Sequence, residues 1–430
     1  MTIFDNITSR PSLLFEASRT NVLTATPEEG LNAAANISPR VELSVHGELA
    51  EVRADWLAFE AVAACTAFQT FGWHDAWQRH IGTARGVLPA IVVGRVGGDI
   101  LFIAPLAVER AAGVRRLVWH ASGLCDYNAP LLAPDFWNVI GKDTFLAELF
   151  PAIKNAVAGK RRFDLISLTK MTERLGDLAN PFVLLCAQSN ASGAHIMRLG
   201  DDWESFYVAK RSSSTRRKDR TKLKRLQEIG AVRFATARSA DEVNRDLDAL
   251  FAQKSKALSA VGAPDFLASP GVTEFFREVA TTEGQFVHVS HLMVGEVIAA
   301  VNLGLVFGGR YYYVLTSYSD GPVSKYGPGA AHLRELFAYA IGLGCRVFDF
   351  TIGDELYKTE WSDETLRLFD HRSAVTALGW LVACPEVAAN RLKRLVKQTP
   401  ILWKLAQDVR RVLRSRRPVE TDPQVEEQSD

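Results

Sequence analysis

An internal repeat is the feature that most constrains how this chain folds. Three short segments of the first half recur in the same order in the second half, and the matching pairs begin at Gly97 and Gly295, Leu146 and Leu333, and Phe163 and Phe348. The separations are 198, 187 and 185 residues, so the order is kept with small insertions. Leu-x-Glu-Leu-Phe is common helix sequence, but three ordered matches favour a duplication over coincidence. Each copy reads as a helix, several antiparallel strands, a second helix and a strand, which together predict an α+β layer.

Length and composition set broad limits on the function. With 430 residues the chain is too long for one ordinary domain, so two or three domains are expected. The net charge of +1 gives no overall basic field of the kind that binds DNA. The five cysteines lack CxxC and CxH spacing, which argues against a disulfide framework and against a zinc site. We therefore expect reduced core thiols, no metal and no DNA partner.

The sequence also predicts the location of the protein and its division into domains. The first ten residues lack the basic and apolar segments of a signal peptide, and no run approaches the roughly 20 apolar residues of a spanning helix. We expect a cytoplasmic protein that at most touches the inner face of the membrane. The expected parts are a poorly ordered leader over residues 1–38, an N-terminal domain over 39–190, a C-terminal domain with the donor site over 191–385, and a basic helical tail with an acidic end over 386–430.

A glycine turn before a helix is the best candidate for binding an anionic cofactor. Gly327-Pro328-Gly329 places proline near the first helical position, where its missing N–H costs nothing. The first turn of the helix then offers free backbone donors to a phosphate or pyrophosphate, although a plain turn and helix start is the simpler alternative. The residues assigned to this site are Lys325 as a countercharge, Gly327, Pro328, Gly329, Ala330 and, in the first turns, His332.

A charged segment follows the next buried strand, Arg346–Phe350. Its candidates for chemistry are Lys358, Asp349, Asp354 and Glu355. A lysine at the end of a sheet is suited to stabilise a developing oxyanion or a phosphate, and a carboxylate is suited to take the acceptor proton. The alternatives are a solvated surface lysine for Lys358 and, for Asp349, a structural bond to a neighbouring loop.

The most basic segment of the chain predicts a helix that starts near Thr215, after a run of serines that can cap it. Its arginines, with Arg216, Arg217 and Arg220 as the main candidates, form either a solvated helix face or a site for an anionic acceptor or a tRNA. Tyr318 is assigned to the substrate site as well, although alternating aromatic residues on a strand are usually core.

Four further segments have patterns that predict their structure. Ala50–Cys65 and Thr144–Ala158 predict helices, and Phe182–Gln188 predicts a strand. Beyond residue 390 the chain is basic and amphipathic as far as Arg417, which predicts either a plain surface helix or contact with an anionic membrane surface.

Several motifs together resemble one family. They are Phe68-Gln-Thr-Phe-Gly-Trp, the basic Arg216–Leu226 segment, Gly295-Glu-Val-Ile-Ala-Ala, Tyr326-Gly-Pro-Gly-Ala, and Phe348-Asp-Phe-Thr-Ile-Gly-Asp-Glu-Leu-Tyr-Lys-Thr-Glu-Trp. Over about residues 40–375 the chain resembles the GNAT-like acetyltransferases of the cellulose-biosynthesis (CelD/BcsL) type, which are related to the FemABX aminoacyltransferases. The last motif is the most specific, and each of the others alone is weak.

The resemblance implies two tandem GNAT-like domains, each a mixed, mostly antiparallel sheet flanked by helices. It implies an acyltransferase that moves an acyl group, acetyl in the first instance, from acetyl-CoA or another acyl-CoA to an amine or hydroxyl of a sugar or polysaccharide precursor. The expected partners are a small-molecule or glycan acceptor and, by peripheral contact, membrane-bound polysaccharide machinery.

Two other functions stay open at this point. The chain lacks the Arg/Gln-x-x-Gly-x-Gly/Ala loop of ordinary GNAT enzymes and has Lys325-Tyr-Gly-Pro-Gly-Ala330 in its place. A Fem-like transferase that uses aminoacyl-tRNA as its donor is therefore one alternative. A catalytically silent GNAT-like protein that binds a ligand or partner in polysaccharide biosynthesis is the other.

Overall fold

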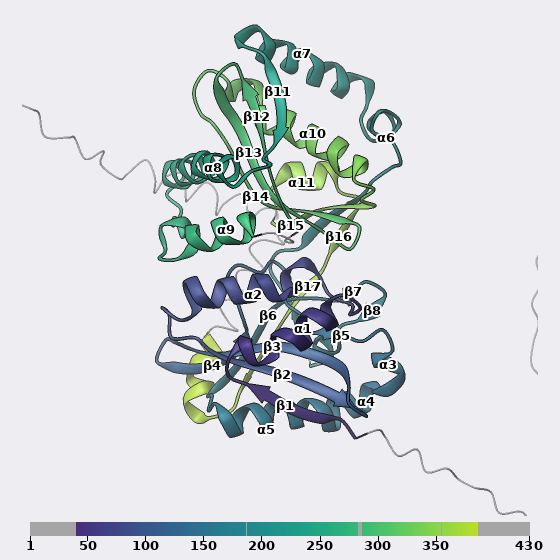
Figure 1. Cartoon of the computed structure of the whole chain (residues 1–430), viewed down its shortest axis with the longest axis vertical. Coiled ribbons are helices and arrows are strands. Elements are labelled where there is room, and N and C mark those ends of the chain that lie inside the picture. The colour runs from purple at the N-terminus through teal and green to yellow at the C-terminus, as the bar shows by residue number, and fades with distance from the viewer. Residues whose placement is uncertain (1–39, 186, 283–285, 354, 386–430) are drawn as a thin grey trace, which may run out of the picture. The chain divides into compact units, whose positions relative to one another are not determined.

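A computed structural model describes residues 40–385, except 186, 283–285 and 354 (Figure 1). The predicted leader and tail, and Asp354 among the candidate site residues, lie outside the described residues. Within them the chain forms two large sheets and one two-stranded sheet, with helices packed beside them. The two-stranded sheet consists of β7 (Arg174–Leu175) and β8 (Leu178–Ala179).

The first large sheet is built mainly from the first half of the chain. Its strands are β1 (Glu42–His46), β2 (Leu88–Val96), β3 (Asp99–Ala111), β4 (Val114–Trp119), β5 (Leu131–Leu132), β6 (Leu165–Thr172), β9 (Gln188–Ser189) and β17 (Leu368–Ala374). They run in the order β1-β2-β3-β4-β6-β17-β9, with β5 paired to β3. The β2–β3 hairpin turns at Gly97-Gly98, where both glycines have positive φ.

The second large sheet is built mainly from the second half. Its strands are β10 (Ala194–Arg198), β11 (Val232–Thr236), β12 (Val287–Val294), β13 (Val297–Phe307), β14 (Arg310–Tyr318), β15 (Val347–Ile352) and β16 (Glu364–Leu366). They run in the order β11-β12-β13-β14-β15-β10-β16. Strands β12, β13 and β14 form a meander in which adjacent strands are antiparallel.

The two sheets share one plan and exchange one strand each. In both, four antiparallel strands are followed by a parallel neighbour, β6 beside β4 and β15 beside β14. The next position in the first sheet is taken by β17 from the end of the described chain, and in the second sheet by β10 from the middle. The shared order supports the predicted duplication, whereas the predicted domain limit at residue 190 stays a prediction.

The helices follow the predicted order. The α-helices are α1 (Arg53–Glu60), α2 (Phe71–Trp77), α3 (Phe136–Val139), α4 (Lys142–Thr144), α5 (Phe150–Lys160), α6 (Trp203–Lys210), α7 (Ser213–Ile229), α8 (Ala240–Ala260), α9 (Val272–Thr281), α10 (Pro328–Gly342) and α11 (Leu356–Trp361). The shorter 3-10 and π turns are η1 (Leu49–Val52), η2 (Ala67–Gln69), η3 (Gln78–Gly82), η4 (Phe145–Leu149), η5 (Pro181–Leu184), η6 (Phe266–Ala268) and η7 (Ser324–Tyr326). Beside the second sheet, α8 and α9 lie on one face and α10 on the other (Figure 1).

Two sequence predictions of secondary structure need correction. The segment predicted as a strand over Phe182–Gln188 begins as the 3-10 turn η5, because Asn180 caps it and Pro181 occupies its first position. Strand pairing starts only at Gln188. The predicted helix over Ala50–Cys65 is shorter, since it is divided into η1 and α1 and ends at Glu60.

Aromatic side chains from both halves form one shared core cluster. Phe68 and Trp73 are buried together with Phe275 and Tyr312. The rings of Trp73 and Phe275 meet edge to face with centroids 4.8 Å apart. Such pairs stabilise beyond their buried area, so this cluster joins the segments that carry the two sheets.

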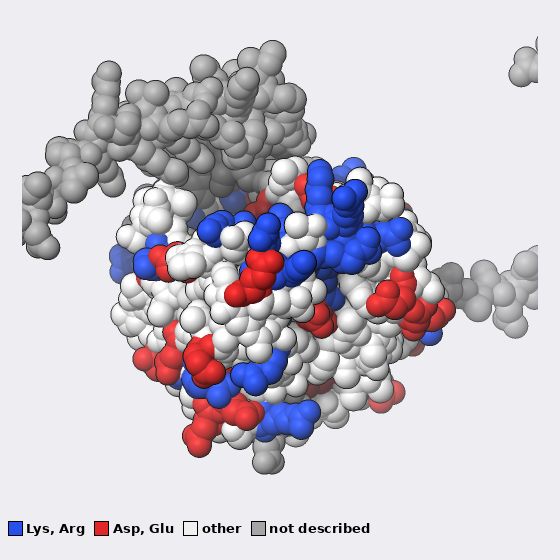
Figure 2. Space-filling model, turned by 90° about the horizontal axis from the view of Figure 1, so that it is seen from above, with Lys and Arg blue, Asp and Glu red and all other residues white. Residues whose placement is uncertain are grey.

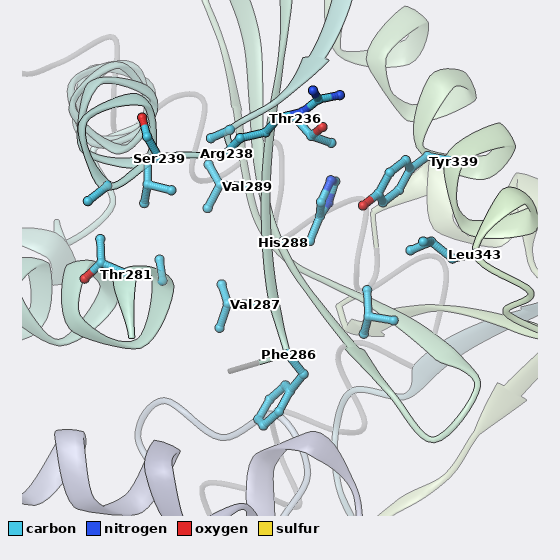
Figure 3. Close-up of a pocket in the computed structure, with 15 residues that line it drawn as sticks. Thr236, Arg238, Ser239, Thr281, Phe286, Val287, His288, Val289, Tyr339 and Leu343 are labelled. Carbon is cyan, nitrogen blue, oxygen red and sulfur yellow. The ribbon is translucent and has the colours of Figure 1, made fainter. Parts of the chain in front are cut away.

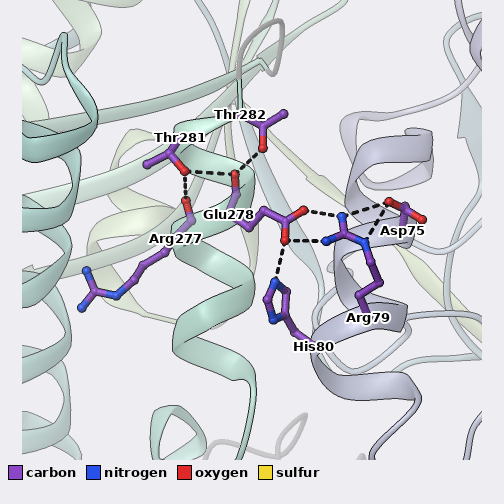
Figure 4. A network of polar contacts seen from close by, with 7 residues as sticks. All are labelled: Asp75, Arg79, His80, Arg277, Glu278, Thr281 and Thr282. Carbon is purple, nitrogen blue, oxygen red and sulfur yellow. Dashed lines mark hydrogen bonds and ion pairs between the residues drawn. The ribbon is translucent and has the colours of Figure 1, made fainter.

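A polar network beside this core also joins α2 and η3 to α9 (Figure 4). Arg79 donates to Glu278 at 2.7 Å and to Asp75 at 2.9 Å, and a ring nitrogen of His80 lies 2.6 Å from Glu278. The bonds from Arg79 lower the pKa of Glu278 below its ordinary value. The contribution of Glu278 to stability is therefore present at neutral pH and lost in acid.

Candidate active site

The site is located where two parallel strands part. Strands β14 and β15 pair only from Arg310 and Val347 to Tyr312 and Asp349. The register between β13 and β14 then shifts around Val314, which leaves that residue unpaired as a β-bulge. A bulge bends the strand that contains it. Beyond it β14 continues to Tyr318 and β15 to Ile352 without pairing to each other, so their last residues face an unpaired gap.

Two lysines point at the ends of these strands. Lys358, on α11, is only 5% exposed and donates from Nζ to the Ile352 carbonyl at 2.8 Å. Its ammonium also lies 3.2 Å from the carboxylate of Glu355. Lys254, on α8, donates to the Thr316 carbonyl of β14 at 3.3 Å. Burial lowers the pKa of Lys254; Glu355 acts to raise it and Lys358 to lower it, so the three charges are close neighbours.

The backbone at Gly353 makes room for this arrangement. Its φ is 147°, and a Cβ there would lie 2.6 Å from Nζ of Lys358. A larger residue would therefore displace the ammonium from the end of β15. The predicted surface-lysine alternative is excluded, because Lys358 is a buried cation with a carbonyl and a carboxylate as its partners.

A carboxylate from the first half reaches the same place. Asp126 lies in the loop between β4 and β5, and burial raises its pKa. Lys170, the Thr351 hydroxyl and Lys358 each act to lower that pKa, but burial outweighs them. Lys170 and Thr351 both have positive φ, 54° and 58°, which is rare for residues with a side chain. Asp126 is thus a proton acceptor of raised pKa beside Lys358.

Asp349 requires a correction, because it is not placed to act as a base. It is fully buried and accepts from the Tyr127 hydroxyl at 2.6 Å, from Arg310 at 2.7 Å and from the Thr351 backbone N–H at 2.8 Å. Burial and Asp349 together raise the pKa of Tyr127 well above its ordinary value, so its hydroxyl keeps its proton. Asp349 therefore acts as a structural tie between β14, β15 and the Asp126 loop.

The helix start that the sequence assigned to a phosphate has the predicted geometry. Gly327 precedes α10 with φ 68° and ψ 58°, and Pro328 is the first helical residue. A Cβ on Gly329 would lie 3.3 Å from the ring of Tyr318, which is 60% exposed. The Lys325 ammonium lies 5.0 Å from the Tyr326 ring, and Ala330 is exposed. These residues lie together at the start of α10.

His332 requires a second correction. Although it lies one turn into α10, its side chain is 1% exposed and points into the sheet, with Nε2 3.1 Å from the Ser290 hydroxyl. Burial, followed by His288 and His291, lowers the pKa of His332 to about 3. A neutral, buried imidazole does not meet a phosphate that approaches from solvent.

The predicted basic helix is α7, and it flanks this turn. Ser212 caps it by accepting from the Thr215 N–H at 3.2 Å. Its one buried residue, Leu226, packs in a cluster with Val323 and Ala331, next to Tyr326. Figure 2 shows Lys and Arg side chains gathered on this end of the molecule. Arg217 and Arg220 are exposed and Arg216 is half-buried, so the basic face of α7 borders the start of α10.

A pocket lined by arginines lies on the other side of the Tyr127–Asp349 pair. It has a volume of about 520 Å³ and is lined by residues of both halves, among them Tyr127 and Arg310. The other arginines of its wall are Arg174, Arg198 and Arg367. Tyr127 lines this pocket, whereas its neighbour Asp126 interacts with Lys170, Thr351 and Lys358.

A second pocket, of about 660 Å³, lies along the edge of β12 (Figure 3). Its wall combines apolar residues such as Phe286, Val287 and Leu343 with polar ones such as Arg238, Ser239 and His288. The ring of His288 stacks on Tyr339 at 4.2 Å, and burial lowers the pKa of His288 to about 3. This pocket contains none of the residues gathered at the ends of β14 and β15.

Sequence reasoning missed three residues of the site. Asp126, Lys170 and Lys254 are far from the motif that contains Lys358, and only the fold brings them near it. The polar loop around Asp126, with buried residues on its far side, was a usable signal. Within the described residues, no group of three or more His, Cys, Asp or Glu is placed to hold a metal ion.

The comparisons with known proteins agree with this geometry. Residues 213–359 match a family model described as an acetyltransferase (GNAT) domain. The matched region runs from α7 through the turn at Gly327 to Lys358, and so contains the basic helix, the helix start and the lysine. It supports the α+β fold class and the acyltransferase class that the sequence predicted. No curated protein matches the chain by sequence.

Solved structures resemble this chain at low sequence identity. A crystal structure of FemX is 11% identical with a TM-score of 0.52, and the match covers 76% of this chain and 96% of that one. L-PGS from Bacillus licheniformis is 12% identical with a TM-score of 0.46, covering 78% and 94%. A tandem GNAT protein from the clavulanic acid biosynthesis pathway is 12% identical with a TM-score of 0.43, covering 78% and 98%. At such identities the likeness concerns the fold, and the finer resemblance to the CelD/BcsL type stays a prediction.

Proposed function

We propose that this protein transfers an acyl group, acetyl in the first instance, from acyl-CoA to an amine or hydroxyl of a sugar or polysaccharide precursor. One observation carries the proposal. Lys254, Lys358, Glu355 and Asp126 converge where β14 and β15 part, next to a helix start that is open to a phosphate. Acyl transfer from a phosphorylated carrier requires a base, cations that stabilise the developing negative charge, and a binding site for the phosphate.

The donor is assigned to the start of α10. Its pyrophosphate accepts from the free backbone N–H groups after Gly327, where the helix dipole favours negative charge. Lys325 and the basic face of α7 add countercharge at the rim. The pantetheine arm then lies in the gap between β14 and β15, which directs the thioester toward Lys358.

Asp126 and the two lysines divide the chemistry. Asp126 takes the proton of the acceptor N–H or O–H, and the freed lone pair forms a bond to the thioester carbon. The oxyanion that results faces the ammonium groups of Lys358 and Lys254. When the intermediate collapses, the C–S bond breaks and the thiolate leaves, to be protonated by the acid form of Asp126. Burial keeps Asp126 a better base than an ordinary aspartate.

The arginine-lined pocket is the proposed seat of the acceptor. Tyr127 and Arg310 form part of its wall and are bonded to Asp349 at the base of β15. Arginines bind carboxylates and phosphates with two parallel bonds. A precursor that carries a nucleotide or a uronic acid fits this charge. Arg216, Arg217, Arg220 and Tyr318 stay assigned to substrate at the outer rim.

Ligand-induced stabilisation tests the donor. Coenzyme A is expected to raise the melting temperature of the protein, whereas uncharged tRNA at matched phosphate concentration is not. A screen of acetyl- and longer acyl-CoAs, with free thiol and product mass as readouts, then identifies the acyl chain. Stabilisation by tRNA and not by coenzyme A would contradict the proposal.

The basic face of α7 favours one second candidate. A long row of exposed Lys and Arg beside the start of α10 also fits the backbone of a tRNA, so a Fem-like aminoacyl transfer is the alternative. If neither coenzyme A nor tRNA binds, a silent GNAT-like binding protein is the remaining function. A cytoplasmic location and contact with membrane-bound polysaccharide machinery stay predictions; no described helix is long and apolar enough to cross a bilayer.

A further inference from the structure

A helix over residues 377–385, which follows β17, exposes its large apolar side chains and buries its small residues. Gly379 and Ala383 are buried. Leu378, Trp380 and Leu381 are 50%, 60% and 62% exposed. A surface helix of a water-soluble domain normally has the opposite arrangement. The exposed set, which we call the outer apolar patch, also includes Val375 in the preceding turn.

Asp164, just before β6, fixes this orientation. Its carbonyl accepts from the backbone N–H groups of Val375 at 2.8 Å and Thr376 at 3.2 Å, and the Thr376 hydroxyl bonds its carboxylate at 3.3 Å. A Cβ on Gly379 would lie 1.8 Å from the same carbonyl. Only glycine allows the helix to lie this close, so the contact with Asp164 determines which face is left outward.

Charge along the chain points to what covers the patch. Residues 374–385 contain no charged side chain, whereas residues 391–417 contain ten Lys or Arg and one acidic residue. An apolar surface followed by a strongly basic segment is the pattern of proteins that bind the interface of anionic membranes. A second copy of the chain would bring one basic segment against another, which opposes pairing through this surface.

We propose that the outer apolar patch docks on the surface of an anionic phospholipid bilayer. Trp380 and the two leucines enter the headgroup and acyl boundary, where an indole ring is favoured. The basic residues after position 390 hold the chain to the charged headgroups. The docking does not depend on the proposed reaction, and it places the first sheet against the membrane through Asp164 and β6.

Vesicle co-sedimentation of the full chain tests the proposal. The wild type is expected to bind vesicles of phosphatidylcholine with phosphatidylglycerol about tenfold more tightly than vesicles of phosphatidylcholine alone, and salt is expected to weaken the binding. Leu378→Gln, Trp380→Gln and Leu381→Gln combined are expected to lower the binding about tenfold. Val62→Gln is the matched control, since Val62 is 64% exposed outside the patch.

A second variant tests the contribution of the basic residues to vesicle binding. Lys393→Gln, Arg394→Gln and Lys397→Gln combined are expected to weaken binding to the anionic vesicles and to leave the weak binding to neutral ones unchanged. The proposal is overturned if the wild type stays in the supernatant with anionic vesicles, or if the patch variant binds as tightly as the wild type. It is also overturned if the wild type is a dimer in solution and the patch variant a monomer, because a second copy is then the occupant.

Discussion

Each large sheet contains a pair of parallel neighbours, β4 and β6 in the first and β14 and β15 in the second, which we call its parallel junction. The two junctions differ although the sheets share one plan. In the second sheet, β14 and β15 part after a bulge and leave a gap that lysines enter from α8 and α11. In the first sheet, β4 and β6 pair over two residues, and the space beyond is filled by the chain itself. Leu131 and Leu132 pair with β3, and Asn128 bridges to Met171 of β6.

Asn128 is the residue that seals the first junction. Its backbone N–H donates to the Lys170 carbonyl at 3.0 Å and its amide to the Thr169 carbonyl at 2.9 Å. The segment that carries it also carries Asp126 and Tyr127, which face the second junction. The first junction is thus filled by the chain itself, and the same segment contains the carboxylate that we propose for the second.

The largest effect is expected from removing the cation at the open junction. Lys358→Met keeps much of the side-chain bulk but loses the ammonium, so turnover is expected to fall by about 10² to 10³. Lys142→Met removes a charge from an exposed position beside the first sheet and is expected to change nothing. Release of free thiol from acyl-CoA measures both. Full turnover in the Lys358 variant would contradict the proposed catalytic role of Lys358.

Asp126→Asn is expected to separate activity from stability. Loss of the base lowers kcat by roughly 10² or more. The fold, in contrast, gains stability at neutral pH: burial raises the folded pKa of Asp126 above its ordinary 3.8, so stability is lost as pH rises through that interval, and the amide avoids the loss. Thermal unfolding at several pH values against the wild type checks the sign. A variant that is both inactive and less stable would point to a structural role instead.

Opening the sealed junction is expected to cost stability. Asn128→Ala leaves the half-buried Thr169 carbonyl without its side-chain donor, which costs about 0.5 to 1.5 kcal/mol of unfolding free energy. Urea denaturation measures the change. If the two junctions were equivalent, Asn128→Ala would also create a second binding site for coenzyme A; calorimetric titration is expected to find no such site, because only the second junction has the Gly-Pro-Gly turn.

The smallest effect is expected from a substitution at Gly327, at the start of α10, and Gly141 at the start of α4 provides a matched control. Gly327→Ala forces a residue with a Cβ into φ 68°, which strains the turn by about 1 kcal/mol and is expected to weaken coenzyme A binding by up to about fivefold. Gly141→Ala, at the start of α4 beside the first sheet, is expected to be neutral, since Gly141 has φ −70°. Equal effects at both positions would remove the distinction between the two helix starts.

Much of the fold was readable from the sequence because it rests on local signals. The repeat predicted the plan that both sheets share, and the serine run predicted the start of α7. Phe182–Gln188 failed because apolar content predicts burial and not the type of element, and Asn180-Pro181 was the stronger local signal. The exchange of β10 and β17 has no local signal, since strand partners are chosen by tertiary packing.

The site was predictable only in part, for a similar reason. Lys358 and the Gly327 turn belong to one continuous motif and were found together. Asp126 and Lys254 interact with residues distant in sequence; the polar loop around Asp126 was its only local signal, and the neighbourhood of Lys254 does not distinguish it from a surface charge. Asp349 and His332 were assigned from their position along the chain, but a strand and a helix each have an inner face, and both side chains lie on it.

The exchanged strands also determine when this protein is able to fold during synthesis. Domains generally fold as the ribosome releases them, N-terminal part first. Here the edge of β6 stays open until the ribosome has added β17, about two hundred residues later, and β10 waits until β15 has emerged. A nascent chain of this protein therefore carries uncovered strand edges through about half of its translation, and such edges are templates for pairing with other chains.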